Sequence, residues 1–153
     1  MQEQGDYYNP DFITTANDTV RESGYITNII TDKAIDWLDH KRDKNRPFAL
    51  FIHHKACHRC WLPELKYLNE YEDKTFTKPA TFNDDYAGRA AAQVQEMRIA
   101  SNHDMDLVYD TKMYRPGMKT RLTENYLRMI SRLDSADLQT YDDFYDPMSR
   151  DFY

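Results

Sequence analysis

The clearest hydrophobic pattern in the chain is a continuous apolar run from Phe48 to Ile52, which directly follows Pro47. The run is short and made of aromatic and aliphatic side chains, as is typical of a strand buried on both faces of a parallel sheet. We therefore predict an α/β fold in which helices and loops surround one central buried strand at about residues 47–53.

A helix is predicted directly before this strand. Apolar side chains recur at the i, i+3, i+4, i+7 spacing of one helical face; they are Ile26, Ile29, Ile30, Ala34, Trp37 and Leu38. This pattern predicts a helix over residues 28–43, with Thr27 placed to accept hydrogen bonds from the free amides at its start. A helix, a short turn and a buried strand form half of a βαβ unit.

The rest of the chain is predicted to form loops and further helices. Residues 1–23 are polar and are expected to form a loop. Helical structure is expected over three further ranges, 64–71 (a short turn), 86–100 and 119–133. Asp134 is expected to cap a last helix, which runs to about Tyr145 and is stopped by Pro147.

One strand cannot satisfy its own backbone hydrogen-bonding groups, and even an isolated hairpin is marginal in water. The composition is also that of a chain with a modest core. Hydrophobic residues make up 41% of the 153 positions, but twelve of them are tyrosines, and the mean hydropathy is -0.87. We therefore predict that the chain is part of a larger α/β domain, whose other strands come from sequence outside it.

The net charge of -6 and the pI near 5.3 disfavour general nucleic-acid binding, which needs a basic face. The 20 lysines and arginines are spread along the chain, which still allows a local basic pocket for an anion. No run of 18 apolar residues predicts a transmembrane helix, and residues 1–6 are polar, unlike a signal peptide. Two cysteines do not form a disulfide framework.

The candidate chemistry follows the predicted strand. His53, His54, Lys55 and His58 come directly after it. In open α/β sheets the carboxyl ends of the strands open into the crevice where ligands bind. An imidazole with a pKa near neutrality can exchange a proton there, and an ammonium group can hold an anion. His53 is expected to point away from His54, because neighbouring side chains of a strand alternate between its faces.

A metal site is the alternative interpretation of this stretch. His54, Cys57, His58 and Cys60 are all possible ligands within seven residues. Their spacing does not match zinc-finger patterns, and Lys55 stands where an H-E-x-x-H site has its glutamate. The sequence therefore favours a site without metal ligands, while a local disulfide between the two cysteines stays open.

The segment His54-Lys55-Ala56-Cys57-His58-Arg59 resembles the H-K-A-P-H-R segment of formylglycine-dependent sulfatases, which belong to the alkaline-phosphatase-like superfamily. The resemblance continues in order along nearly the whole chain. The other similar stretches are Gly5 to Phe12, Gly24 to Leu38, Thr81 to Met97 and Asp134 to Phe152.

This resemblance implies roles for individual residues. His58 matches the histidine that faces the sulfate group and helps to protonate the leaving alcohol, so it is the predicted catalytic residue. Lys55, His54, Arg59 and Trp61 are the predicted substrate-binding residues. Cys57 departs from the family, which usually has proline at this position.

The resemblance also implies what the parent enzyme uses. Sulfatases of this family attack with a formylglycine made in a C/S-x-P-S-R motif and hold a calcium ion with aspartate and asparagine side chains. Neither Cys57 nor Cys60 stands in such a motif. We therefore expect residues 1–153 to be an internal part of a single sulfatase catalytic domain, without the N-terminal nucleophile region and the C-terminal metal-binding region. No metal ligand is assigned to this chain.

The expected parent enzyme removes sulfate from a sulfated carbohydrate, with N-acetylglucosamine-6-sulfate as a plausible target, and works in the periplasm or outside the cell. The expected partners are this carbohydrate and the remainder of the sulfatase domain. Two alternatives stay open: a phosphoester or phosphonate hydrolase of the same superfamily, and a non-catalytic interaction module.

Asp84, Asp85 and Arg89 form either a site-associated cluster or a salt-bridged loop.

Overall fold

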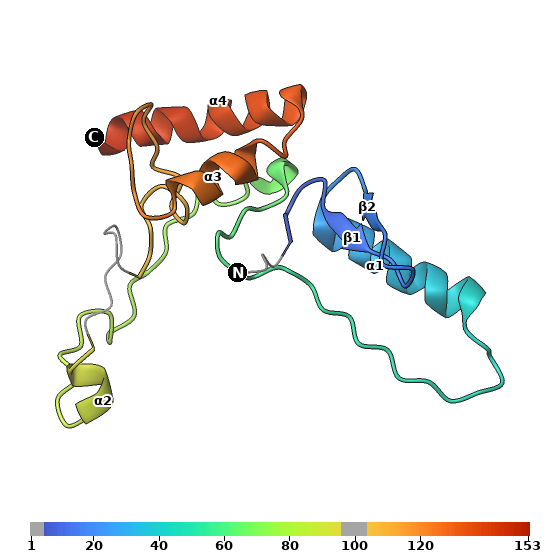
Figure 1. Ribbon diagram of the computed structural model, residues 1–153. Coiled ribbons are helices and arrows are strands. Elements are labelled where there is room, and N and C mark those ends of the chain that lie inside the picture. Colours follow the sequence, from blue (N-terminus) through green and yellow to red (C-terminus); the bar gives the residue numbers. More distant parts are fainter. Residues whose placement is uncertain (1–4, 96–103) are drawn as a thin grey trace.

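The computed structural model describes residues 5–95 and 104–153. A β-hairpin and helix α1 (Ile26–Asp36) lie on one side, and helices α3 (Thr123–Ile130) and α4 (Ser135–Phe152) lie on the other (Figure 1). A long connection between α1 and α3 crosses from one side to the other and carries the predicted site. Its far part, around the short helix α2 (Ala90–Gln93), projects away from both helical parts.

Residues 1–23 were predicted to be a loop, but part of this range forms a hairpin. Strands β1 (Asp11–Ile13) and β2 (Thr19–Arg21) pair antiparallel. The Thr14 hydroxyl accepts hydrogen bonds from two amides of the connecting turn, at distances of 3.2 Å. Arg21 also binds Asp11 on the facing strand at 2.8 Å. These local polar contacts form the hairpin without the apolar alternation by which a strand is recognised in sequence.

Helix α1 (Ile26–Asp36) confirms the predicted helix and continues as a π-helical turn, Trp37–Lys41. The helix begins one residue earlier than the predicted cap. Tyr25 is the N-cap, with extended backbone, and it makes no side-chain capping bond. Thr27 therefore lies inside the first turn, and its predicted capping role was wrong.

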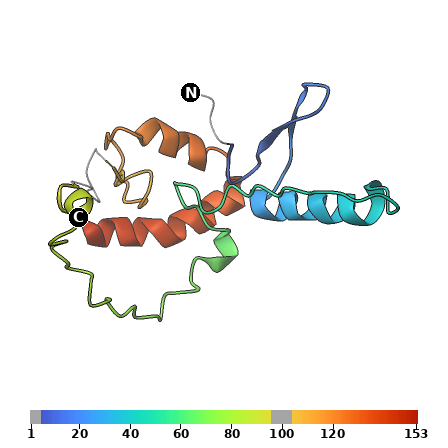
Figure 2. The same ribbon diagram turned by 90° about the horizontal axis from the view of Figure 1, so that it is seen from below.

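The predicted strand at 47–53 does not form in this chain, which corrects the central element of the fold prediction. Within the described residues this segment has no partner strand, and Phe51 is 79% exposed. The segment runs back along α1, with the ring of Phe48 5.4 Å from that of Trp37 (Figures 1 and 2). The physical reason is that a strand needs neighbouring backbone to pair with.

Two short helical elements lie in the connection. A 3₁₀ turn, Leu65–Tyr67, confirms the predicted turn near residue 64 and buries Leu65. The α2 helix, Ala90–Gln93, is much shorter than the predicted helix at 86–100, whose residues 96–100 lie outside the described residues.

The last two helices follow the predicted order. Helix α3 spans Thr123–Ile130, and α4 spans Ser135–Phe152. The carboxylate of Asp134 accepts hydrogen bonds from the amides of Ala136 and Asp137, which confirms it as the cap of α4.

Pro147 lies inside α4 and does not stop it, contrary to the prediction. Two contacts hold the turn beyond it. The Ser149 hydroxyl donates to the Tyr114 carbonyl at 2.6 Å, and the Tyr153 hydroxyl donates to the Met113 carbonyl at 3.3 Å. Tertiary contacts thus offset the amide hydrogen bond that proline cannot make.

The core joins the two sides through tyrosines and aliphatic residues. Its buried members are Tyr7, Tyr8, Ile26, Cys60, Leu62, Leu65, Val108, Tyr126, Met129, Leu133 and Tyr141. Tyrosine hydroxyls make bonds across it, since the Tyr8 hydroxyl accepts from the Leu65 amide at 2.8 Å and the Tyr25 hydroxyl donates to the Leu62 carbonyl at 2.9 Å. The segment that ends at Leu62 is therefore anchored at the centre of the molecule.

Candidate functional site

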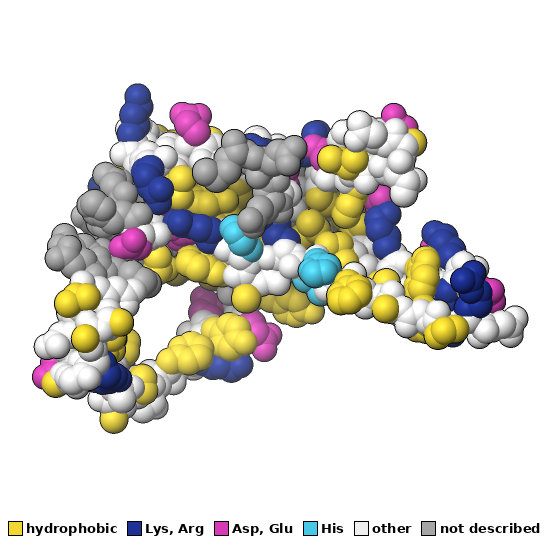
Figure 3. All heavy atoms as spheres, turned by 60° about the horizontal axis from the view of Figure 1, so that its bottom comes forward, with side chains coloured by type: hydrophobic (Ala, Val, Ile, Leu, Met, Phe, Trp, Pro, Cys, Tyr) yellow, Lys and Arg dark blue, Asp and Glu magenta, His cyan; other side chains and the backbone are white. Residues whose placement is uncertain are grey.

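The predicted site residues lie on a folded part of the central segment. Two tight turns follow one another, because the His58 amide donates to the Lys55 carbonyl at 2.8 Å and the Trp61 amide donates to the His58 carbonyl at 3.0 Å. These turns carry the chain from the exposed stretch into the core at Cys60. In the space-filling view the imidazoles lie at the centre of this face, with basic and hydrophobic side chains around them (Figure 3).

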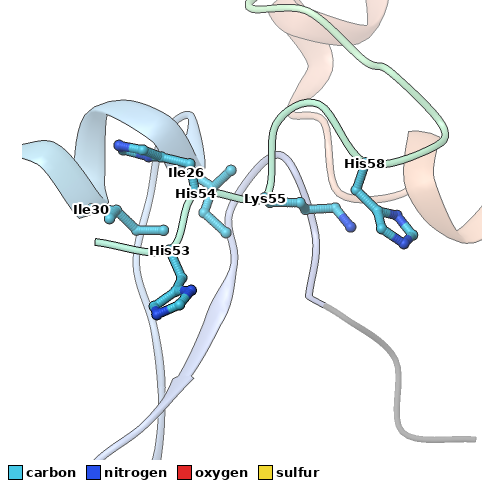
Figure 4. Close-up of a pocket in the computed structure, with 6 residues that line it drawn as sticks. All are labelled: Ile26, Ile30, His53, His54, Lys55 and His58. Atoms are coloured by element: carbon cyan, nitrogen blue, oxygen red, sulfur yellow. The ribbon is translucent and has the colours of Figure 1, made fainter. Parts of the chain in front are cut away.

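Two pockets meet at Lys55 and His58, which line both. The first has a volume of about 250 Å³ and is otherwise lined by Ile26, Ile30, His53 and His54. Figure 4 shows the rings of His53 and His54 on opposite sides of the segment, as predicted, with the Lys55 side chain extended toward His58.

The second pocket is larger, about 530 Å³, and is rich in cations. Besides Lys55 and His58, its basic lining consists of Arg59, Arg121 and Arg128, and its acidic lining is Asp6. Asp6 binds Arg128 at 3.3 Å. An excess of positive groups around a concave surface suits an anionic ligand, even in a chain whose net charge is -6.

The tautomer of His58 is determined by its neighbour. The Nδ1 atom lies 2.5 Å from the carbonyl oxygen of Arg59. A carbonyl oxygen can only accept a hydrogen bond, so Nδ1 must carry the hydrogen. Nε2 is then the ring nitrogen left for a ligand, and the exposed side chain gives a ligand access to it.

Three successive carbonyl groups around His58 are each held by a side chain. The Tyr7 hydroxyl donates to the His58 carbonyl at 2.5 Å, the His58 ring donates to the Arg59 carbonyl, and the Lys112 ammonium donates to the Cys60 carbonyl. Two of these contacts, from Tyr7 and Lys112, thus hold the backbone around the imidazole from distant parts of the chain.

Arg59 also uses its side chain inside the protein. Its guanidinium binds both carboxylate oxygens of Asp110, with Nε 2.9 Å from Oδ1. The Asp110 side chain is fully buried, whereas that of Arg59 is 31% exposed at the edge of the second pocket. A bidentate pair of this kind fixes the orientation of the guanidinium.

Asp110 belongs to a buried turn, residues 106–112. Asp106 accepts hydrogen bonds from the amides of Val108, Tyr109 and Leu122 and from the Thr120 hydroxyl. Burial raises the pKa of Asp106, but these hydrogen bonds outweigh that effect and lower it below its ordinary value. The turn is therefore held by an ionised, fully bonded carboxylate.

Burial affects the two lysines of the site in the same direction. It lowers the pKa of Lys112 to about 8, and it also lowers the pKa of the half-buried Lys55. The ammonium group of Lys55 lies 5.0 Å from the centre of the Tyr7 ring, a cation–π contact. Lys55 is thus a partly desolvated cation at the junction of the two pockets.

The structure brings together four of the five predicted site residues. His54, Lys55, His58 and Arg59 line one or both pockets, whereas Trp61 is 43% exposed and lines neither of these two. The charged cluster of Asp84, Asp85 and Arg89 lies in the projecting loop before α2, where Arg89 forms a salt bridge with Asp84. Of the two interpretations, a site-associated cluster or a salt-bridged loop, the structure supports the second.

Four residues of this region were missed by the sequence analysis: Asp110, Lys112, Arg121 and Arg128. Each lies more than fifty positions after His58, and a charged residue on a helix or turn is normally a solvated one. The only sequence signal is the close spacing of Asp106, Asp110 and Lys112, which does not by itself distinguish a buried turn from an exposed one.

The described residues do not suit a metal ion. Residues 5–95 and 104–153 contain no group of three or more His, Cys, Asp or Glu side chains arranged to hold one. Cys57 is exposed and Cys60 is buried, and both are free thiols. The Cys60 thiol donates to the Met129 sulfur at 3.0 Å, so the four candidate zinc ligands do not converge.

Within the same residues, no helix has the length and apolar character needed to cross a membrane.

Comparison with known proteins places the chain in a family. The family model described as sulfatase matches residues 2–145. The chain is 41% identical over 140 residues to the N-acetylglucosamine-6-O-sulfatase of Bacteroides thetaiotaomicron, covering 91% of this chain and 24% of that protein. A solved structure of a protein in complex with its substrate D-glucosamine-2-N,6-O-disulfate matches with a TM-score of 0.80 and 38% identity, covering 98% of this chain and 30% of that one.

The chain thus spans about a quarter of the curated relative and less than a third of the solved one. The family model covers most of the chain, and the matched range includes the segment that carries His58. The chain belongs to the sulfatase family.

Proposed function

We propose that this chain is an internal part of a sulfatase catalytic domain, and that the longer protein, here called the parent sulfatase, hydrolyses a 6-O-sulfate ester of a glucosamine. The two relatives act on or bind sulfated glucosamines, which supports the choice of substrate class. The observation that carries the proposal is the position of His58. Its Nε2 is available for proton transfer where two pockets meet beside Lys55.

The proposed role of His58 follows from the chemistry of a sulfate monoester. When the bond between sulfur and the ester oxygen breaks, negative charge accumulates on the oxygen of the leaving sugar. A protonated His58 can donate its Nε2 hydrogen to that oxygen, and the proton leaves with the alcohol. Lys55 lies beside His58 and is assigned to the negatively charged sulfuryl oxygens.

The nucleophile is proposed to come from another part of the parent sulfatase, as a formylglycine that attacks sulfur. The calcium ion implied by the resemblance is likewise proposed to be held by another part of the parent sulfatase, and residues 5–95 and 104–153 contain no group of three or more His, Cys, Asp or Glu side chains arranged to hold a metal. Export of the parent sulfatase to the periplasm or the cell exterior stays a prediction from the resemblance.

The exposed apolar segment supports the proposal that the chain is part of a larger domain. Phe48, Leu50, Phe51 and Ile52 are all at least 37% exposed, yet they form the most strand-like run in the sequence. In the parent sulfatase we assign this segment to a sheet whose other strands bury these side chains.

The experiment is a leaving-group test in the parent sulfatase with His58→Ala. A sugar alcohol is a poor leaving group and needs a proton, whereas the phenol of 4-nitrophenyl sulfate leaves without one. We expect kcat for N-acetylglucosamine-6-sulfate to fall about 10²- to 10³-fold, with a loss of less than about 10-fold for the aryl sulfate. His40→Ala is the matched control, because this exposed histidine lies in the π-helical turn that follows α1. Equal losses for both substrates would remove the acid role from His58.

A further inference from the structure

We propose that Asp110 and Lys112 are positioning residues for His58, acting through the two residues that follow it, Arg59 and Cys60. This inference rests on the proposed function, because it concerns how the proton donor is oriented. It also gives Arg59 a role other than the sugar binding expected from the sequence.

Arg59 is the link between the imidazole and the buried turn. Its carbonyl oxygen accepts the Nδ1 hydrogen of His58, and its guanidinium is held by both oxygens of Asp110. Rotation of the backbone at Arg59 would therefore break contacts at both ends of the residue. The direction of the His58 ring depends on a carboxylate that is 51 positions away from Arg59 in sequence.

Asp110 is itself fixed. Its Oδ2 accepts the Asp106 amide at 2.7 Å, and Asp106 binds the start of the same turn and the segment before α3. Both carboxylates are buried, with Asp106 2% and Asp110 4% exposed. Movement of this turn would leave buried charges without hydrogen bonds, which is costly. The turn is thus a rigid support for the site.

Lys112 ties the same turn to the site a second time. Its ammonium group donates to the Cys60 carbonyl and, at 2.9 Å, to the Asp110 carbonyl. It is 4% exposed, so these carbonyls replace its water. The side chain of Arg59 and the carbonyl of Cys60, the two residues directly after His58, are consequently both bound by this one turn.

The support explains why the site needs a part of the chain so remote in sequence. The segment around His58 is a loop, and a loop alone would let the imidazole sample several orientations. A proton donor works when its hydrogen points at the leaving oxygen, so a less ordered ring lowers the rate of the step that needs the proton. Binding of the sulfate group does not depend on this orientation in the same way.

The test is Asp110→Asn in the parent sulfatase, measured with the two substrates of the leaving-group experiment. We expect kcat for the sugar sulfate to fall about 10- to 100-fold, while the aryl sulfate loses less than about 3-fold and KM changes little for either. The ratio of the kcat values for the two substrates does not depend on the fraction of the enzyme that is folded. Simple loss of folded protein would lower both rates equally and would overturn the proposal.

The matched control is Asp84→Asn, which removes the acidic partner of another arginine, Arg89, in the projecting loop. It should leave both rates unchanged. Arg59→Lys is the second variant, for the case that Asp110→Asn does not fold, because it retains the charge but cannot form the bidentate pair. Arg59→Lys should change the ratio of the two kcat values in the same direction as Asp110→Asn.

A double variant separates this inference from the proposed function. The double variant His58→Ala, Asp110→Asn should have the same ratio of kcat values for the two substrates as His58→Ala alone. Orientation of the imidazole has no effect once the ring has been removed. If His58→Ala changes the ratio and Asp110→Asn does not, the positioning role is wrong and the function stands. If His58→Ala leaves the ratio unchanged, the proposed function of His58 fails, whatever the result for Asp110.

Discussion

The Nδ1 atom of His58 lies 2.5 Å from the carbonyl oxygen of Arg59, the next residue in the chain. This contact determines which ring nitrogen can exchange a proton with a ligand. The side chain of the same Arg59 binds Asp110, which lies 51 positions further along the chain. One residue thus joins the local geometry of the site to the tertiary fold.

Arg121 is expected to contribute to substrate affinity, because it lines the cation-rich second pocket. In the parent sulfatase, Arg121→Gln should raise KM for a sulfated glucosamine by about 5- to 10-fold, the loss of roughly 1 kcal/mol from one charged hydrogen bond, with kcat little changed. Steady-state kinetics measures both values. Arg150→Gln, an exposed arginine near the end of α4, is the control and should leave KM unchanged. A KM unchanged by Arg121→Gln would exclude this pocket from substrate binding.

The stability of the chain should pass through a maximum at alkaline pH. The pKa of Lys112 is about 8 in the fold and 10.5 as the ordinary value, so the unfolded chain binds more protons between these values and stability rises with pH. Burial raises the pKa of Tyr126 and of Tyr145 to about 12 from 10.0, so above pH 10 the folded chain binds more protons and stability falls.

Urea unfolding at a series of pH values between 7 and 11.5 measures this profile. Replacing Lys112 by Met should remove most of the rise above pH 8, although Lys55, whose pKa is also lowered by burial, retains part of it. The exposed Lys44→Met is the control and should retain the full rise. A stability that falls steadily from pH 8 would contradict the buried position of Lys112.

The two thiols should differ strongly in reactivity. Cys57 is exposed, whereas Cys60 is 1% exposed and lies against Met129. A thiol reagent should modify Cys57 first and Cys60 at least about 100-fold more slowly, because labelling of Cys60 requires an opening that costs roughly 3 kcal/mol or more. Peptide mass spectrometry identifies the labelled residue, and Cys57→Ser should leave only the slow reaction. Equal rates in the absence of denaturant would mean that Cys60 is not in the core.

Phe51 should have opposite effects in two contexts. It is 79% exposed in this chain, so Phe51→Ser should decrease aggregation of the isolated chain. In the parent sulfatase, where we assign it to a buried strand, the same change should destabilise the protein by about 2 to 4 kcal/mol. Light scattering of the chain and thermal unfolding of the parent measure the two effects. An unchanged melting temperature of the parent would argue against a buried strand.

Several features could be predicted from sequence because their causes are local. The apolar spacing from Ile26 to Leu38 produces α1, since one helical face must be covered. Asp134 caps α4 with bonds to amides two and three residues away. The order of His54, Lys55 and His58 likewise placed them at one site, because neighbours in a tight turn stay together.

Other features depended on residues far away in sequence. The segment predicted as a strand at 47–53 is exposed, because its backbone has no partner strand among the residues that the structure describes. Pro147 stands inside α4, because Ser149 and Tyr153 bind the segment before α3. The local preferences of the residues show neither whether a strand will find a partner nor which distant residues a helix will contact.

The sequence by itself determined the candidate proton donor, the cation beside it and the family pattern in which they stand. The tertiary structure decided that Asp110 and Lys112 bind the two residues that follow His58, and that Arg121 and Arg128 complete a pocket. The physical reason is how far apart in sequence the interacting residues lie. A histidine and its turn are specified within six residues, whereas a buried carboxylate finds its arginine only when the chain folds and removes both from water.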